Sequence, residues 1–548
     1  MAPRPPGTDS ADVVVVGSGH NGLVAACYLA RAGLSVEVVE SDDVLGGAVS
    51  TVERWPGVRV DRGSSAHVII RSSGIVEDLD LAAHGLRYVD CDPWGFAPAP
   101  FPGAAGPEGQ PLVFSVDLDA TCASIAAACG PGDAAAYREF VAVWSRRSRA
   151  VAASFGRRPT PAGLVRSFWP LGAPSAGRPR TSGGDLAADF LGSGDALLDR
   201  WFTSERLKAA LAWFGAQSGP PMSEPGTAAM VGWAALLHET PPGHPVGGSG
   251  GLTEALRRRL EADGGRVVLG DGAARLLVED GRAAGVETVS GRRVRAEAVL
   301  AACHIGVTRA LAGDAAPPAL ALADPPLGNG FGLVVRALTD AVPVYPGVPP
   351  AVSATGLQLL CTHRADLAAA HGDWAAGRLP RIPVPLAMSF SATDDTLAPP
   401  GRHVVTIWGQ WYPYELAEGG DWDALADTEA TRLVAAVDRY APGFAASVQR
   451  LYVQTPLALE RELSLPRGNV MHVEMGLASM FGLRPTPALS GYTVPGLPGL
   501  YLAGASTHPG GGVSGNSGRT AARLLLADRR PAARARRAVG RALRRAGR

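Results

Sequence analysis

Lysine is almost absent from this chain of 548 residues: Lys208 is the only one, and arginine supplies the rest of the positive charge. The 51 lysine and arginine residues are balanced by 51 aspartate and glutamate residues, so the formal net charge is zero. Proteins that bind nucleic acid through its phosphates carry an excess of positive charge. We therefore expect no nucleic-acid partner, and we attribute the preference for arginine to a GC-rich coding sequence.

Cysteine is also scarce, and its spacing is uninformative for a metal or disulfide framework. The six cysteines form no C-x-x-C pair, and Cys27 stands inside a segment with helical periodicity. This pattern argues against a disulfide-stapled domain and against a cysteine-based zinc site. We expect small buried thiols in a reducing cytosol, and no metal site.

Long apolar runs are missing as well. A membrane span takes roughly 20 consecutive apolar residues, and no such run occurs. The valine-rich N-terminal stretch resembles the core of a signal peptide, but Gly17 to Gly22 interrupt it and only Arg4 precedes it as a basic residue. We therefore expect no cleaved leader. With 46% hydrophobic and 19% charged residues the composition is that of a globular protein, which we expect in the cytoplasm.

The stretch Ala11 to Glu40 has the order of a dinucleotide-binding unit. Four valines, Val13 to Val16, suit a strand buried on both faces. G-x-G-x-x-G follows directly, then a helical pattern closed by Gly33, and a second apolar strand that ends in Glu40. The helix N-terminus can hold a diphosphate. Glu40, 23 residues after the first glycine, can accept hydrogen bonds from ribose hydroxyls and disfavours NADP.

The glycines of this motif have separate roles. Gly17 permits the sharp turn, Gly19 lets the backbone approach the pyrophosphate, and Gly22 lets the helix pack against the strand. A second pair, Gly46 and Gly47, permits another close approach to the nucleotide loop. The motif leaves the choice between FAD and NAD open.

Composition changes along the chain predict the domain organisation. Residues 1–10 are proline-rich and read as a disordered lead-in, and 133–240 are mostly helical. Strand and helix patterns return at Pro245. We expect a nucleotide-binding domain in three pieces, 11–85, 245–310 and 491–528, a substrate domain that is helical over 86–244 and a mixed sheet over 311–490, and a basic tail at 529–548.

Large apolar side chains gather in the helical part. They form either an ordinary helical core or a hydrophobic substrate pocket, and the sequence leaves both open. They are Trp201, Phe202, Trp213, Phe214, Met222, Met230 and Trp233.

The C-terminal stretch 496–528 holds a second nucleotide-domain signal. Leu500 to Ala503 read as a short buried strand, and Gly504 permits a tight turn. A glycine-rich run then precedes a helix that we expect to start near Val513. A helix N-terminus placed at the pyrimidine edge of a flavin stabilises the negative charge of the reduced ring, by about 1 kcal/mol.

Together the motifs resemble the phytoene-desaturase-like flavoproteins, relatives of the amine oxidases. They are GSGHNGLVAACYLARAG with its later Glu40, VGGSGGLTEALRRRLEADGG and LYLAGASTHPGGGVSGNSG, and SFSATDDTLAPPGRH and RGNVMHVEM add to the likeness, which covers nearly the whole chain. It is closer to the pyridine-nucleotide-disulfide-oxidoreductase-domain branch than to dedicated carotenoid desaturases. The resemblance implies an α/β fold with a Rossmann-type FAD-binding domain, of the glutathione-reductase-2 kind, and an inserted mixed α+β substrate domain.

The resemblance also implies which residues hold FAD. The ADP half would lie against the first loop and Glu40, the adenine against the strand that carries Ala273, and the ribityl chain and isoalloxazine ring against the C-terminal loop. The full set of expected cofactor contacts is Gly17, Gly19, His20, Asn21, Gly22, Glu40, Gly46, Gly47, Ala48, Ala273, Gly504, Gly512 and Val513.

One position departs from the amine-oxidase pattern. Amine oxidases usually carry an arginine after the second glycine pair, where this chain has Ala48. No aromatic cage for an amine can be placed either, so desaturation is favoured over amine oxidation. Our candidate bases are His67 and His508, because both stand in glycine- and serine-rich segments expected near the flavin. The alternative is that each ring only bonds backbone in its loop.

The leading hypothesis is an FAD-dependent desaturase or oxidase of an apolar or secondary-metabolite substrate, with O2 or a quinone as electron acceptor. A redox-neutral isomerase of the carotenoid-isomerase type and a flavin amine oxidase are alternatives. A flavin-free binding protein similar to the Rab-escort proteins is a third class, against which the intact nucleotide loop speaks. The arginine-rich tail predicts either a solvated end or weak contact with an anionic membrane surface.

Overall fold

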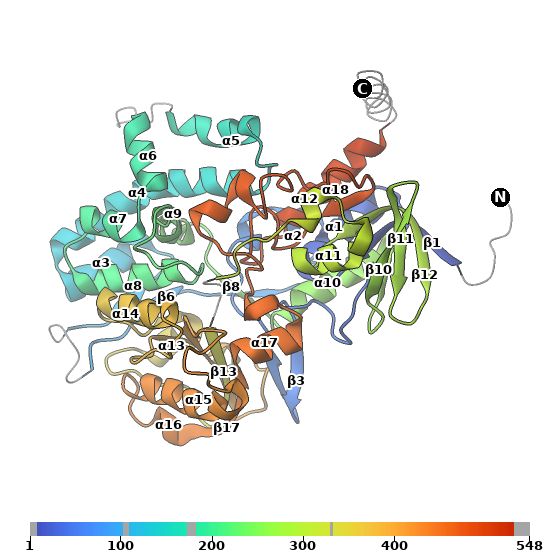
Figure 1. The fold of residues 1–548 in the computed structure, drawn as a ribbon. Coiled ribbons are helices and arrows are strands. Elements are labelled where there is room, and N and C mark those ends of the chain that lie inside the picture. Colours follow the sequence, from blue (N-terminus) through green and yellow to red (C-terminus); the bar gives the residue numbers. More distant parts are fainter. Residues whose placement is uncertain (1–7, 102–108, 173–181, 329–331, 531–548) are drawn as a thin grey trace.

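The computed structural model describes residues 8–101, 109–172, 182–328 and 332–530. In Figure 1 a first sheet lies at the right, a layer of helices at the upper left and a second sheet at the lower left. The predicted basic tail beyond Arg530 and most of the predicted lead-in lie outside the described residues. The lead-in prediction was too long, because the first strand already begins at Thr8.

The first sheet joins three distant stretches of the chain. Its order is β10-β11-β12-β1-β2-β9, and β18 pairs in parallel with β12. The central strand β1 runs parallel to both β12 and β2. The bounds are β1 Thr8–Val16, β2 Val36–Val39, β9 Arg266–Val268, β10 Ala273–Glu279, β11 Arg282–Thr288, β12 Arg293–Ala301 and β18 Leu500–Leu502.

The four valines of β1 are buried on both faces of this sheet, as predicted. Val13 and Val15 pack on the side of α1 (His20–Arg31), α10 (Gly250–Ala262) and α18 (Asn516–Arg529). Val14 and Val16 pack on the opposite side with the β10–β11 hairpin and α11 (Ile305–Ala312). Both faces of the sheet are therefore covered, and only the ends of its strands face the rest of the molecule.

The start of α18 was predicted three residues too early. The helix begins at Asn516, because Val513 has φ of 53° and Gly515 has φ of 67°, both in the left-handed region. A right-handed helix cannot pass through these two residues. The loop that was expected to be the first turn of the helix is therefore an irregular segment between the sheet and α18.

The second sheet is mixed, as expected, and has the order β17-β13-β16-β15-β14-β6-β7. All its pairs are antiparallel except β14 with β6. The place of β6 and β7 at the edge of this sheet was not predicted. The bounds are β6 Gly95–Ala97, β7 Leu112–Phe114, β13 Gly332–Thr339, β14 Leu357–Leu359, β15 Pro385–Met388, β16 His403–Gln410 and β17 Val448–Gln454.

The second sheet is covered on both faces. Alternate residues of β13 pack in different cores: Leu333 and Val335 with the helix α15, and Val334 with the helical layer. The helices that accompany the sheet are α13 Pro350–Thr355, α14 Arg364–Ala375, α15 Trp422–Asp438, α16 Phe444–Ser447 and α17 Pro456–Leu463.

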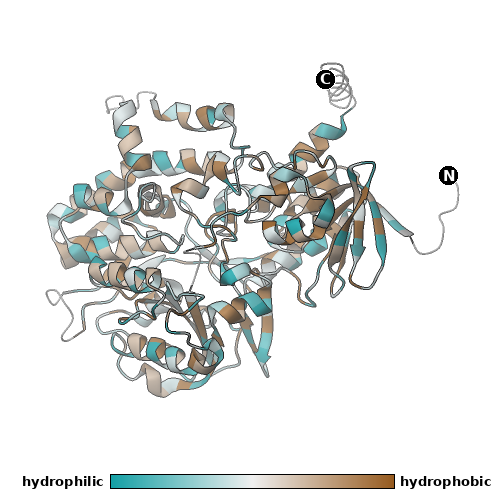
Figure 2. Cartoon of the chain, viewed as in Figure 1, coloured by the Kyte–Doolittle hydropathy of each residue, from teal (hydrophilic) through white to brown (hydrophobic). Residues whose placement is uncertain are grey.

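The helical layer is built from seven α-helices. Hydrophobic and hydrophilic residues interleave along them in Figure 2, as amphipathic helices over a common core require. Their bounds are α3 Leu118–Cys129, α4 Pro131–Phe155, α5 Pro161–Phe168, α6 Gly183–Leu191, α7 Gly194–Trp201, α8 Glu205–Ala216 and α9 Ala228–Gly232. Within the described ranges no helix has the length and apolar character needed to cross a bilayer.

Two short ribbons and two short helices connect these layers. The strand β3 (Thr51–Trp55) pairs with β4 (Val58–Asp61), and β5 (Tyr88–Asp90) pairs with β8 (Gly243–Pro245). The helices are α2 Ile75–Asp78 and α12 Pro318–Ala321. The ribbon β5–β8 brings together the two ends of the helical insertion.

Candidate functional site

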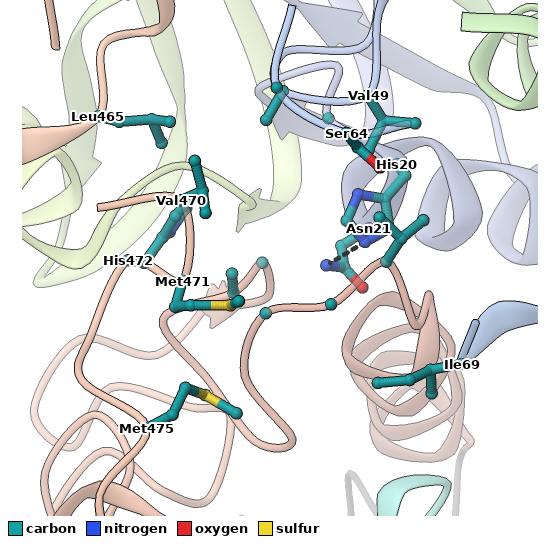
Figure 3. Close-up of a pocket in the computed structure, with 18 of the residues that line it drawn as sticks. His20, Asn21, Val49, Ser64, Ile69, Leu465, Val470, Met471, His472 and Met475 are labelled. Atoms are coloured by element: carbon teal, nitrogen blue, oxygen red, sulfur yellow. Dashed lines mark hydrogen bonds between the residues drawn. The ribbon is translucent and has the colours of Figure 1, made fainter. Parts of the chain in front are cut away.

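A cavity of about 760 Å³ lies where the first sheet, the helical layer and the second sheet meet. The carboxyl ends of β1, β2 and β12 open into it, and so does one face of the second sheet. The segment 463–481, which follows α17, forms a further wall. Figure 3 shows two of these walls, with His20 and Asn21 opposite Met471 and His472.

Most of the predicted cofactor contacts line this cavity. They are Gly17, Gly19, His20, Asn21, Glu40, Gly46, Gly47, Ala48, Ala273, Gly504, Gly512 and Val513. Gly22 does not line it. A Cβ at Gly22 would fall 2.2 Å from the carbonyl oxygen of Gly17, so this glycine holds α1 against the strand, which is the packing role expected of it.

The N-terminus of α1 points at the cavity without a cap. Gly19 is its N-cap residue, no side chain bonds the free N–H groups, and no acid stands in the first turn. Asn21 Nδ2 donates to His20 Nε2 at 3.0 Å, and burial lowers the pKa of His20 to about 4. The imidazole is therefore neutral at pH 7, and the helix end offers donors to an anion.

Glu40 ends β2 on the cavity wall, with its carboxylate held in place by the chain itself. The backbone N–H of Ser18 donates to one carboxylate oxygen at 2.7 Å, and the backbone N–H of Asp42 donates to the other at 3.0 Å. The hydroxyls of Ser18 and Ser41 also donate to these oxygens, at 2.9 and 3.1 Å, and a hydroxyl can rotate its proton away when a ligand hydroxyl takes its place. The geometry fits an acceptor for ribose hydroxyls.

The C-terminal loop approaches the same cavity through positive-φ residues. Gly504 has φ of 86°, and a Cβ there would fall 2.6 Å from the carbonyl oxygen of Ala302 at the end of β12. Gly512 and Val513 also have positive φ, at 93° and 53°. At Gly504 the loop therefore lies so close to the first sheet that no side chain would fit between them.

The two predicted catalytic histidines do not reach the cavity, and this part of the prediction finds no support. His67 is fully buried, with Nδ1 2.8 Å from the Tyr88 hydroxyl and Nε2 3.0 Å from the Ser249 hydroxyl. His508 is fully buried, and its Nε2 lies 3.0 Å from the carbonyl oxygen of Ser154. Ala66 and Val68, on either side of His67, do line the cavity. Both rings serve packing between segments.

The sequence argument missed His472, which does line the cavity. Its Nδ1 lies 3.1 Å from the Ser506 hydroxyl, and its carbonyl oxygen accepts from His304 Nε2 at 3.0 Å. Burial and the neighbouring His304 hold the pKa of His472 well below 6.5. The only signal in the sequence was the RGNVMHVEM stretch, which contributes to the family resemblance but gave no indication of a role for this histidine.

Arg484 fixes the wall that carries His472, and it too was missed. The side chain is fully buried and donates only to backbone carbonyls. It bonds Met471 O and Ala505 O, each at 2.6 Å, and Glu474 O at 2.9 Å. One guanidinium thus ties the segment after α17 to the C-terminal loop.

Most of the remaining cavity wall is apolar. It includes Val151, Phe155, Leu164, Phe168, Phe190, Phe214, Met230, Trp233, Val334, Leu357, Met388, Trp408, Leu465, Met471, Met475, Met480 and Phe481. Of the large side chains singled out in the helical stretch, three line the cavity, and Trp201, Phe202, Trp213 and Met222 pack in the helical core. The seven side chains thus divide between the helical core and the cavity wall, and a substrate at that wall stays a prediction.

Comparison with known proteins places this architecture in a family. A profile described as "Flavin containing amine oxidoreductase" matches residues 185–526, and an "NAD(P)-binding Rossmann-like domain" matches residues 15–79. Pyridine nucleotide-disulfide oxidoreductase domain-containing protein 2 of Rattus norvegicus is 32% identical, over 94% of this chain and 93% of that protein.

Two further relatives extend the comparison. Hydroxyneurosporene desaturase of Rhodobacter capsulatus is 28% identical, over 95% of this chain and 99% of its own. The crystal structure of an oxidoreductase from Methanosarcina mazei has the same fold, with a TM-score of 0.58 at 17% identity, covering 94% of this chain and 99% of that one. These matches confirm the resemblance seen in the motifs. The chain belongs to the flavin-containing amine oxidoreductase family and is an FAD-dependent oxidoreductase.

Proposed function

We propose that this chain binds FAD along the first sheet and desaturates an apolar substrate held between the helical layer and the second sheet. Dioxygen or a quinone would serve as the final electron acceptor. The observation that carries the proposal is the composition of the cavity wall. One half has the glycines and acid of a nucleotide site, and the other half is lined mostly by aromatic and aliphatic side chains.

The nucleotide half fits FAD in three respects. The uncapped start of α1 suits the diphosphate, and a Cβ on Gly19 would meet nothing within 4 Å, so the backbone there is open to an approaching phosphate. Glu40 suits the ribose hydroxyls of the adenosine, and Ala273 suits the adenine. Gly504, Gly512 and Val513 would border the ribityl chain and ring.

The apolar half would do most of its work by positioning. Bound FAD takes up two electrons as a hydride from a substrate C–H bond. The protein's part is to hold that bond in a fixed orientation and to exclude water. Rings such as Phe155, Phe214 and Trp233 provide a wall with few polar atoms, which suits a hydrocarbon body.

Desaturation removes a hydride from one carbon and a proton from the carbon next to it. His472 is our candidate for the base that accepts this proton. It is neutral at pH 7, because its pKa is well below 6.5, so a ring nitrogen is free to accept. Ser506 holds the ring in one orientation. His304 also lines the cavity, but both of its ring nitrogens are engaged, Nε2 with the carbonyl oxygen of His472 and Nδ1 with the Gly306 N–H. His20 also lines it, but it stands at the start of α1, in the nucleotide half.

Amine oxidation is the second candidate, and it is favoured only by the name of the family. Among the described residues on the cavity wall, Glu40 and Asp42 are the acids, and both stand at the nucleotide end. The substrate half carries Arg336 instead. A protonated amine would be repelled there, and the relative named hydroxyneurosporene desaturase supports desaturation instead.

Anaerobic flavin bleaching tests the proposal. Purified protein is mixed without oxygen with candidate hydrocarbons, and absorbance at roughly 450 nm is followed. Stoichiometric bleaching with formation of a new double bond supports desaturation. Turnover without net bleaching would identify an isomerase, and bleaching by primary amines in place of hydrocarbons would identify an amine oxidase.

A further inference from the structure

A buried arginine lies on the substrate side of the cavity. Arg336 is 2% exposed and stands in the middle of β13, paired across the sheet with Thr406 on one side and Tyr452 on the other. Its face of the sheet continues into the cavity wall with Val334, Thr406, Trp408 and Met388. A cation has thus been placed on an otherwise neutral and largely apolar surface.

The charge of Arg336 has no ion-pair partner. Its Nε donates to the carbonyl oxygen of Asp61 at 3.0 Å, and Nη1 is buried with no hydrogen-bond partner. No carboxylate of the described ranges lies within 4.0 Å of the guanidinium; the acids that act on it at longer range are Asp61 and Glu462.

Those two acids are engaged elsewhere. Asp61 Oδ1 accepts from the Thr51 hydroxyl at 2.7 Å and from the Ser249 N–H at 2.8 Å. Glu462 bonds the hydroxyl of Tyr452 and the side-chain amide of Gln454. Burial lowers the pKa of Arg336 to about 10, which leaves it charged at pH 7. A buried charge without a partner is costly, so such a residue is usually completed by a ligand.

We propose that Arg336 binds the carboxylate of the substrate, so that the substrate is an apolar carboxylic acid. The proposal rests on the function proposed above and narrows it. Nε donates to the Asp61 carbonyl oxygen, and the two terminal nitrogens have no hydrogen-bond partner among the described residues, so together they can pair with the two oxygens of a carboxylate. The hydrocarbon body extends along the aromatic wall.

A phosphate of FAD is the other anion that enters this cavity. The residues suited to the diphosphate belong to the first sheet and to the start of α1, whereas Arg336 belongs to the second sheet. Its neighbours on that face are side chains of the substrate half. The geometry therefore favours the substrate as the source of the anion, and flavin content decides between the two in the experiment.

Binding of simple surfactant-like probes tests the assignment without turnover. Dodecanoate, below its critical micelle concentration, and 1-dodecanol, below its solubility limit, are titrated by calorimetry into the FAD-bound protein and into the variants R336M and R336K. We expect wild-type protein to bind dodecanoate at least about tenfold more tightly than dodecanol, R336M to lose that difference, and R336K to retain part of it. Flavin content and thermal unfolding are measured for each variant.

Each outcome has a defined meaning. Equal affinity of wild-type protein for the acid and the alcohol refutes the anion site, and this comparison needs no variant to fold. Loss of FAD from folded R336M assigns the guanidinium to the cofactor and also refutes it. Carboxylate binding that depends on Arg336, in a protein whose flavin no apolar acid bleaches, upholds the site and refutes the desaturation.

Discussion

Asn21 and Gly518 lie in direct contact although 497 residues separate them along the chain. The Asn21 side-chain oxygen accepts from the Gly518 N–H at 3.4 Å, and a Cβ on Gly518 would fall 2.0 Å from the Asn21 carbonyl oxygen. The contact brings the first turn of α18 against the first turn of α1. The start of α1 and the loop before α18, through Gly512 and Val513, border the same cavity.

Replacing Gly518 with alanine should separate these helices. The added carbon would clash with the backbone of Asn21. We therefore expect a loss of about 1–3 kcal/mol in the free energy of unfolding and a lower melting temperature. The matched control is Gly132→Ala in α4, where a Cβ meets nothing within 4 Å. There the gain in helix propensity should stabilise by up to about 1 kcal/mol. Equal effects of the two changes would contradict the close contact.

Two glycines of the first loop should respond differently to the same change. Gly19→Ala adds a carbon facing open space, so the apoprotein should melt as the wild type does, while affinity for FAD falls by at least about tenfold. Gly22→Ala drives a carbon into Gly17, so the apoprotein itself should be destabilised by about 1–3 kcal/mol. Thermal melts of the apo forms and flavin titration check the pair. Full FAD affinity in folded Gly19→Ala would count against the diphosphate assignment.

His472→Gln should slow substrate oxidation without releasing the cofactor. Loss of a positioned base typically costs about 100-fold or more in rate. We expect that loss in anaerobic flavin reduction, at unchanged flavin content. His67→Gln is the comparison, because that ring is buried but does not line the cavity. It should lower stability and leave the reduction rate close to that of the wild type. A larger rate effect at His67 than at His472 would reverse the assignment.

Acid should destabilise the fold partly through His508. Burial lowers the pKa of His508 to about 4, and its Nδ1 is buried with no partner, so the folded state resists protonation. The unfolded state takes up the proton below its pKa of 6.5. Its contribution to stability is therefore complete above pH 6.5 and is lost as the pH falls from there towards about 4.

The variant His508→Gln measures how much of the pH dependence of stability comes from His508. One pH unit below the unfolded pKa, a single such group accounts for about 1.4 kcal/mol. Urea unfolding at about pH 7.5 and about pH 5.5 should show a drop that is smaller by this amount in the variant than in the wild type. The glutamine amide can still donate to Ser154 O. The same pH dependence in both proteins would show that His508 is protonated in the folded state.

Local patterns predicted those parts of the molecule that local forces determine. The β1 valines and the loop glycines were placed correctly, because strand burial and close backbone approach follow from a few adjacent residues. Most of the expected cofactor contacts line one cavity for the same reason. The mixed sheet expected over 311–490 is also present, although β6 and β7 join it from outside that range.

What could not be predicted depends on partners remote in the chain. His67 and His472 look alike in sequence, yet Tyr88 and Ser249 bury the first ring, and Arg484 holds the second on the cavity wall. The parallel pairing of β6 with β14 joins segments more than 200 residues apart. Arg336 reads as an ordinary strand residue until its neighbours across the sheet are known.

The position of β18 in the first sheet has a consequence for biosynthesis. This strand pairs with β12 through Val299 and Leu500, and α18 follows it. A ribosome makes β1 long before β18, so the nucleotide half of the cavity stays incomplete until β18 and the loop that follows it have been made. A nascent chain stalled before Leu500 would expose the edge of β12 to other chains.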